Sequence, residues 1–334
     1  MKRRILPALF VLMLAVTAGS FVCGRFAVSP QEIVSTLHTW FTGGELDTLQ
    51  QQSLGILLNL RLPRVLAALV IGGSLAISGC AYQAMFLNPL VSPGILGVLA
   101  GASFGAGLGI VFFSSWLLTQ VLAFACACAA VVLSLFFAGI MRKSSLLVLI
   151  LGGMVSTALF TSLISILKFI ADPNRKLPEL VYWLMGTFSR IDADTLLYLG
   201  LPMLAGILFL SCQGKAVNAL SMGEEEALSL GVSVKWTRFV IIGTATCISA
   251  LTVVLVGVVG WVGLVIPHIM RFLIGPDHRL LLPASAMGGA IFMVITDTLT
   301  RNVLSAELPV GVFTSLISLP IFIFSLRYSK GVWR

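Results

Sequence analysis

Residues 101–105, GASFG, have the GxSxG spacing that presents a nucleophilic serine in many hydrolases. That chemistry requires a strand–turn–helix elbow around the serine, with a histidine and an acid as partners. The motif lies instead within an apolar segment that has no acidic residue nearby. We therefore reject a hydrolase and predict helix packing, because glycines at every fourth position give a smooth face that a neighbouring helix can approach closely. These glycines are Gly97, Gly101, Gly105 and Gly109.

The other reactive residue types predict neither a metal site nor a nucleotide site. His268, in IPHIMR, has no His, Cys or carboxylate at ligand spacing, so we expect a packing or helix-end role. The six cysteines are scattered without a CxxC pair, which predicts neither disulfides nor zinc. No GxxxxGK(S/T) motif occurs, so the chain has no P-loop of its own, and if transport here is driven by ATP, another subunit must bind the nucleotide.

Charged residues inside the apolar segments are rare and therefore informative. Asp297 lies four residues before Arg301, which predicts an ion pair on one helix face near the outer end rather than a proton relay. In RLPR, Arg61 and Arg64 stand where an apolar segment begins. These residues alone leave two interpretations open, namely anchors at the membrane edge or an outward-facing site for an acidic partner.

Three consecutive glutamates, residues 224–226, lie in the longest inward segment, 213–237. Ser221 and Glu224 have the spacing of a capping box, and Gly231 is a natural stop, so we predict one short helix with its glutamates in the first turn. A helix of about nine residues is not stable alone in water and must dock, either on a partner or on the chain's own membrane domain. The apolar residues available for docking are Ala227, Leu228 and Leu230.

The whole chain is too apolar to fold in water. Of its 334 residues, 58% are hydrophobic and 10% are charged, whereas soluble domains carry about 25% charged residues. We predict an all-α polytopic protein in a lipid bilayer, with one transmembrane domain over residues 1–334. The net charge of +8 comes from dispersed basic residues without a basic helix face, so nucleic acid is not an expected partner.

About ten transmembrane helices account for the apolar segments. The first resembles a signal peptide but is expected to be retained, because no clear A-x-A cleavage site follows it. The eighth contains Pro267 and is expected to be a broken helix. The ten lie near residues 5–22, 62–86, 93–113, 115–140, 145–171, 195–212, 238–258, 260–275, 280–304 and 308–327.

An even number of spans puts both termini on one side of the membrane. That side would carry 13 of the 21 Lys and Arg residues, which favours cytoplasmic termini. Two outward, periplasmic segments are longer than turns. Residues 23–60 contain a helix start with Ser29, Pro30 and Glu32 at the spacing of a capping box, and residues 172–194 carry an apolar patch expected to lie along the membrane surface.

A weak internal similarity links PLVSPGIL (89–96) with GLVIPHIM (263–270), which share Leu-Val-x-Pro. If the second span corresponds to the seventh, the offset of five spans makes the two halves inverted in topology. Inverted repeats are a common construction in transporters.

Several long motifs, in the same order, resemble the FecCD family of iron-chelate and cobalamin permeases from type II bacterial ABC importers. The similarity covers nearly the whole chain beyond residue 55. It is carried by the segments LRLPRVLAALVIGGSLAISGCAYQAMFLNPLVSPGILG (60–97), YWLMGTFS (182–189), ALSMGEEEALSLGVSV (219–234), GWVGLVIPHIMRFLIGPDHRLLLPASAMGGA (260–290) and DTLTRNVLSAELPVGVFTSLISLPIFIFSL (297–326).

The resemblance implies a ten-span permease of inverted-repeat fold in the bacterial cytoplasmic membrane, without a catalytic site, metal site or bound cofactor. Its implied partners are a second permease subunit, commonly an identical copy, two cytoplasmic ATPases that bind ATP and Mg²⁺, and a periplasmic substrate-binding protein. The pathway would lie at the dimer interface, lined by the fifth and tenth spans. A ferric siderophore is the first expected cargo, with heme, cobalamin and molybdate as alternatives.

The resemblance also assigns two sets of residues by motif position. Arg61, Arg64 and Arg301 would meet glutamates on the binding protein, since arginine forms charge-assisted, often bidentate bonds with carboxylates. Glu225, Ala227 and Gly231 match the importer pattern E-A-A-x-x-x-G, with a glutamate in place of the middle alanine. The implied ATPase-coupling residues are Ser221, Met222, Gly223, Glu224, Glu225, Glu226, Ala227, Leu230 and Gly231.

Two other classes of protein remain as alternatives. A self-sufficient secondary carrier would need buried ion-binding groups, which are nearly absent from the sequence. A membrane receptor or sensor without transport is the other. Co-purification with an ATPase would separate all three.

Overall fold

The computed structural model describes residues 5–24, 29–140, 146–303 and 307–328. Within these ranges the chain folds into helices and no strand, which confirms the all-α prediction. Several basic residues of the charge count lie outside the described residues, at positions 2–4, 25, 142, 143, 330 and 334.

A helix occupies each of the ten predicted spans. Seven described helices are apolar and long enough to cross a membrane: α1 (Ile5–Val22), α4 (Leu62–Met85), α6 (Trp116–Ile140), α7 (Leu146–Ile170), α9 (Ala193–Cys212), α12 (Val234–Val256) and α14 (His278–Asn302). The other three predicted spans hold shorter apolar helices: α5 (Val98–Leu108), extended by a wider turn over Gly109–Phe113, α13 (Val262–Ile274) and α15 (Val310–Tyr328).

Helix α4 forms the centre of the bundle, and every residue from 71 to 86 is buried. Glycines bring its neighbours into direct backbone contact. A Cβ atom on Gly72 would lie 2.1 Å from the carbonyl oxygen of Gly289 in α14, and one on Gly79 would lie 1.7 Å from that of Gly263 in α13. Only glycine fits at such separations, so these contacts fix how α13 and α14 pack on α4.

The glycine stripe in the predicted third span packs as expected at three of its four positions. Gly101 and Gly105 face α6, where an added Cβ would approach the carbonyl oxygens of Cys126 and Leu122 to 2.4 and 2.0 Å, and a Cβ on Gly109 would meet the backbone of Thr119. Gly97 also lies close to a helix, because an added Cβ would come within 2.9 Å of Ser156 Oγ in α7, but it precedes α5 with φ +82° and is not on the face that the other three share. The positive φ ends the helical periodicity that would have placed Gly97 on the shared face.

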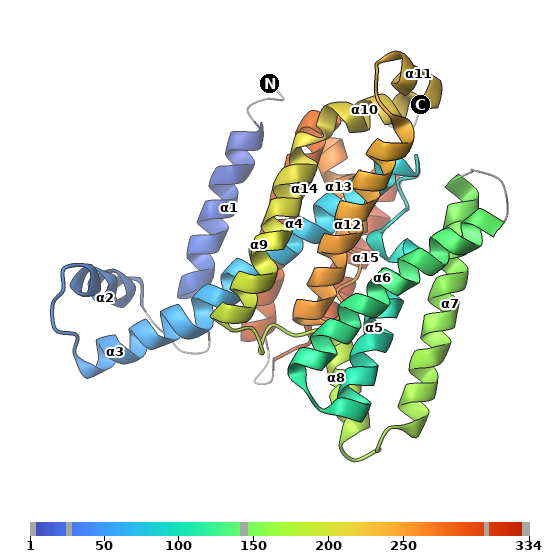
Figure 1. Cartoon of the computed structure of the whole chain (residues 1–334). Coiled ribbons are helices and arrows are strands. Elements are labelled where there is room, and N and C mark those ends of the chain that lie inside the picture. Colours follow the sequence, from blue (N-terminus) through green and yellow to red (C-terminus); the bar gives the residue numbers. More distant parts are fainter. Residues whose placement is uncertain (1–4, 25–28, 141–145, 304–306, 329–334) are drawn as a thin grey trace.

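Different elements mark the two ends of the bundle (Figure 1). One end carries α10 (Gly214–Met222), α11 (Glu224–Ser229) and the beginning of α1. The other end carries α8 (Lys176–Met185). Also away from α11, an arm made of α2 (Pro30–Phe41) and α3 (Thr48–Gly55) projects from the body. From α3 the chain continues without a break, through a wider turn over Ile56–Arg61, into α4.

One of the two local predictions for the outward segments is confirmed, and the other is corrected. The Ser29 capping box is confirmed, because the Ser29 N–H donates to Glu32 Oε2 at 2.8 Å and the Glu32 N–H donates to Ser29 Oγ at 3.2 Å. The apolar patch in residues 172–194, which was predicted to lie along the membrane surface, is partly buried inside the protein. Leu180 and Trp183 of α8 are buried against the bundle, because the apolar face of this short helix has the protein interior to pack on.

The prediction of a broken eighth span was also wrong. Helix α13 continues through Pro267, and the non-helical residues precede it, with positive φ at Gly257 and Trp261. The two similar segments contact each other, since an added Cβ on Gly263 would lie 2.8 Å from Cδ of Pro93. Pro93 begins a short 3₁₀ turn, whereas Pro267 lies inside a helix, so the shared Leu-Val-x-Pro does not mark matching local structures.

Candidate functional site

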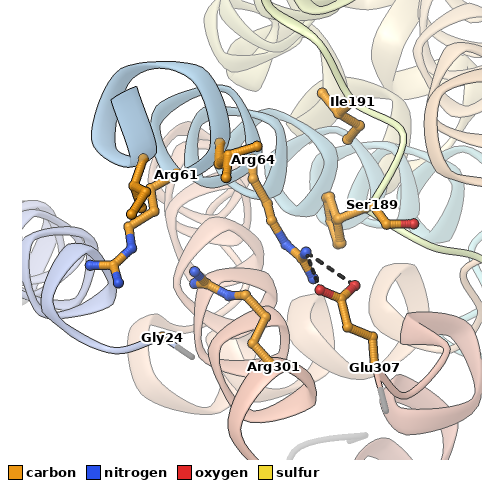
Figure 2. Close-up of a pocket in the computed structure, with 10 residues that line it drawn as sticks. Gly24, Arg61, Arg64, Ser189, Ile191, Arg301 and Glu307 are labelled. Carbon is orange, nitrogen blue, oxygen red and sulfur yellow. Dashed lines mark hydrogen bonds and ion pairs between the residues drawn. The ribbon is translucent and has the colours of Figure 1, made fainter. Parts of the chain in front are cut away.

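Three arginines from two helices converge at the end of the bundle opposite α11 (Figures 1 and 2). Arg61 ends the wider turn before α4, Arg64 follows within the first turn of α4, and Arg301 lies in the last turn of α14. The glycine contacts between α4 and α14 hold these two helix ends together. All three arginines line one cavity of about 210 Å³, together with Glu307 and Ser189.

Two carboxylates bind these arginines within the chain. Arg64 Nε lies 2.8 Å from Asp297 Oδ1, and Arg64 Nη1 lies 3.0 Å from Glu307 Oε1. Arg301 Nε lies 3.1 Å from Asp297 Oδ2, and its Nη2 donates to Ser20 Oγ at 2.8 Å. The predicted pair of Asp297 with Arg301 is therefore present, and Arg64 completes a network around the same aspartate.

Arg61 is the third member and is buried, with 4% of its surface exposed. Its Nη1 donates to the main-chain carbonyl of Phe21, and its guanidinium lies against Gly24, where an added Cβ would come within 2.9 Å of Nη2. Three guanidinium groups and two carboxylates leave the cluster with one excess positive charge. The cluster is thus a partly enclosed cavity lined by three arginines, two of which are held in position by ion pairs within the chain.

The sequence analysis predicted a role for these arginines, but it did not predict the two carboxylates that bind Arg64. Asp297 and Glu307 are 233 and 243 residues away from Arg64 along the chain, so no local spacing could link them. Glu307 is also the more accessible carboxylate, with 27% of its side chain exposed against 1% for Asp297. Glu307 is therefore the more accessible of the two carboxylates bound to Arg64.

At the other end, the predicted capping box of Ser221 and Glu224 was wrong. Ser221 belongs to α10 and donates to the carbonyl of Asn218 at 2.7 Å, so it cannot cap the next helix. Gly223, with φ +132°, separates α10 from α11 and makes the chain turn sharply. The spacing S-x-x-E does not indicate this break. The break depends on the backbone conformation of Gly223, which other residues rarely adopt.

The predicted stop at Gly231 is present. Gly231 has φ +77°, and its N–H donates to Leu228 O at 3.0 Å while the N–H of Val232 donates to Ala227 O at 2.9 Å. This pair of bonds is a Schellman motif, which satisfies the last carbonyls of the helix. Helix α11 is thus a defined six-residue turn from Glu224 to Ser229, shorter than predicted.

The glutamates of α11 have different surroundings. Glu224 pairs with Arg238 of α12 across 2.9 Å, and the carboxylate of Glu226 folds back toward Gly223. Glu225 is exposed, and its side chain makes no hydrogen bond or ion pair with another described residue. Of the predicted docking residues, Ala227 is buried within the chain, whereas Leu228 and Leu230 are 61% and 64% exposed. The exposed surface of α11 therefore presents two leucines beside three glutamates, of which Glu224 is paired with Arg238.

Helix α10 is tied to the beginning of α14. Asn218 Nδ2 donates to Asp277 Oδ1 at 2.7 Å, and the N–H of His278 donates to Asn218 Oδ1 at 2.9 Å. Hydrogen bonding to the Arg279 guanidinium, aided by Asn218, holds the pKa of the Asp277 carboxyl well below its usual range. Asp277 therefore remains ionised at neutral pH and caps α14 while it anchors α10.

Comparison with known proteins identifies the architecture that carries these two ends. The FecCD transport family model matches residues 10–328. The chain belongs to the FecCD family. The chain is 38% identical to the molybdate import system permease protein MolB of Haemophilus influenzae, over 96% of this chain and 94% of MolB. It is 35% identical to the vitamin B12 import system permease protein BtuC of Escherichia coli, over 98% and 96% of the two chains.

A solved structure agrees with this membership. An inward-facing conformation of a putative metal-chelate type ABC transporter superimposes with a TM-score of 0.87 at 35% identity, over 97% of this chain and 99% of that one. As a FecCD protein, the chain is a multi-pass permease subunit of an ABC importer, a class that generally lacks a catalytic site of its own. Among the described residues, no three His, Cys, Asp or Glu side chains gather as a metal site would require.

Proposed function

We propose that a periplasmic binding protein docks at the cluster of Arg61, Arg64 and Arg301, while cytoplasmic ATPases dock on α11. The observation that supports this proposal most strongly is the placement of the two surfaces at opposite ends of one bundle (Figure 1). One surface carries excess positive charge, and the other exposes Glu225, Leu228 and Leu230. The N-terminus, which leads into α1 on the α11 side, is then cytoplasmic.

Helix α14 offers a direct mechanical connection between the two surfaces. Its first residue, His278, is bonded to Asn218 of α10, and its last turns carry Asp297 and Arg301. When the ATPases close on ATP, they would push on residues 219–231 and tilt α14 as a rigid rod. The arginine network would move with it, so that docking and ATP hydrolysis are coupled through one helix.

A double substitution tests the coupling role. Glu225→Arg reverses the exposed charge of α11, and Gly231→Pro forbids the φ of +77° that ends it. We expect ATP hydrolysis by the assembled complex to continue while transport in proteoliposomes is lost. Retained transport would refute the role assigned to residues 219–231.

For the cargo we propose a metal-containing compound, with a ferric siderophore first and heme, cobalamin and molybdate as competitors. The relatives named above handle molybdate and vitamin B12, both of which contain a transition metal. We also propose a homodimer whose pathway lies at the interface of the two copies, lined by the fifth and tenth spans, α7 and α15. Calorimetric titration of the cognate binding protein with each candidate cargo would select among them.

A further inference from the structure

An apolar groove lies between α6, α7 and α12, outside both surfaces described above. Its volume is about 480 Å³. Val132, Leu135 and Phe239 contribute to its walls and are 65%, 44% and 64% exposed. Gly243 leaves part of the floor open, because a Cβ added there would meet no atom within 4 Å. An apolar surface of this kind is complementary to a hydrocarbon chain.

The mouth of the groove is basic. Lys235 and Arg238, near the beginning of α12, both line it, and Lys235 is exposed. Arg238 Nη1 pairs with Glu224 of α11, but Arg238 Nε is buried with no hydrogen-bond acceptor among the described residues. Of these two cations only Arg238 has a carboxylate partner among the described residues, and that carboxylate is solvent-exposed, so the mouth keeps an excess of positive charge. The mouth is complementary to an additional anion with several acceptor oxygens.

The groove has the dimensions of one membrane leaflet. From Lys235 at the mouth to Cys247 at the deep end, α12 rises by about 18 Å. Half of the hydrocarbon core of a bilayer is about 15 Å thick. Trp236 stacks on Phe239 beside the mouth, with ring centroids 5.8 Å apart. Aromatic side chains next to basic ones are typical of the membrane–water interface.

We propose that this groove binds an anionic phospholipid, with its phosphate between Lys235 and Arg238 and an acyl chain along Gly243. Placing that lipid in the inner leaflet rests on the orientation proposed above, whereas the binding itself does not. Because Arg238 also holds Glu224, the bound phosphate would share its guanidinium with α11. The lipid would thereby stabilise the end of α12 on which α11 rests.

Native mass spectrometry of the purified importer complex tests this proposal. The complex is incubated with phosphatidylglycerol or phosphatidylcholine, and the retained lipid is measured. We expect wild type to retain phosphatidylglycerol preferentially. Lys235→Gln removes one charge at the mouth and should lower that retention about fivefold. Gly243→Leu fills the acyl path without removing charge and should lower retention of both lipids.

A matched control separates this site from general surface charge. Lys215 of α10 is also exposed at the α11 end but does not line the groove, so Lys215→Gln should leave lipid retention unchanged. Equal retention by Lys235→Gln and wild type would overturn the proposal, as would equal loss from Lys215→Gln.

The same spectra report whether the occupant is protein instead. If Gly243→Leu dissociates a permease dimer, the groove is an interface between two copies and the lipid proposal fails. Should Gly243→Leu not assemble, the comparison of Lys235→Gln with Lys215→Gln still decides, because surface substitutions seldom unfold a protein. Lipid retention is measured without transport, so a failure here leaves the importer function separately testable.

Discussion

At the scale of single residues, Glu307 is the group in the arginine cluster with which the proposed binding protein would compete. It occupies Arg64 with two hydrogen bonds, of 3.0 and 3.2 Å, and is the more exposed of the two carboxylates. A glutamate from a binding protein would have to replace it. If the binding protein docks as proposed, the intramolecular pair lowers its affinity while keeping Arg64 in position.

Glu307→Gln should strengthen docking of the binding protein by about threefold to tenfold, because it removes a competing charge. Surface plasmon resonance of the permease complex in nanodiscs measures the change. The gain should shrink as salt is raised, since the interaction between partly exposed charges is screened.

The matched variant is Arg64→Gln, which should weaken docking and abolish the effect of Glu307→Gln in the double variant. Charge reversal at Arg301 is a poor test, because Arg301→Glu would place a second buried carboxylate beside Asp297. Unchanged affinity in both Glu307→Gln and Arg64→Gln would show that the cluster only holds α4 and α14 together.

At the scale of elements, α11 combines an internal anchor with a free surface. Ala227 is buried, and Glu224 is paired with Arg238, so these residues hold the helix on its own domain. Leu228 and Leu230 face away from that domain. The interpretation that the acidic segment rests on its own membrane domain is thus confirmed for one side of α11, whereas docking of the other side on a partner stays a prediction.

Leu228→Asp should reduce co-purification of the ATPase by about tenfold, because it puts a charge into an apolar contact. The thermal midpoint of the permease should not change, since Leu228 is 61% exposed. Val34→Asp in α2 is the control, because Val34 is 67% exposed at the other end of the bundle. Loss of the ATPase in both variants would contradict a specific role for α11.

The contact between α4 and α14 predicts a stability effect. Gly289→Leu would force a side chain against the Gly72 carbonyl and should lower the unfolding free energy by about 2 kcal/mol or more. The thermal midpoint in detergent measures it. Gly139→Leu in α6 is the control, since an added Cβ there meets no atom within 4 Å. Equal midpoints for the two variants would show that α14 can move away from α4 without cost.

Helix boundaries in this chain follow from local sequence, whereas helix partners do not. Apolar runs long enough to cross lipid placed all ten spans, because the bilayer sets their length. Gly72 and Gly289 are 217 positions apart, and nothing in either segment shows that their backbones touch. The capping box at Ser221 is absent because the chain turns at Gly223, with φ +132°, and the S-x-x-E spacing does not indicate that turn.

At the scale of the whole molecule, the two proposed docking surfaces lie at opposite ends of the bundle. At the positively charged end, Asp297 and Glu307 of the same chain already bind Arg64 and Arg301. Motif position alone could not show that Arg61 and Arg301 are buried. Helix α14 runs between the ends and touches both networks. A secondary carrier needs no such connection, because its energy comes from ions bound near the midplane.

Reconstituted uptake tests the importer proposal most directly. The permease is placed in proteoliposomes with its ATPase inside and its binding protein outside, and uptake of metal-containing cargo is measured. We predict uptake that requires ATP, the ATPase and the binding protein together, and that is lost with Glu225→Arg and Gly231→Pro. Uptake by the permease alone, driven by a proton or sodium gradient, would contradict it.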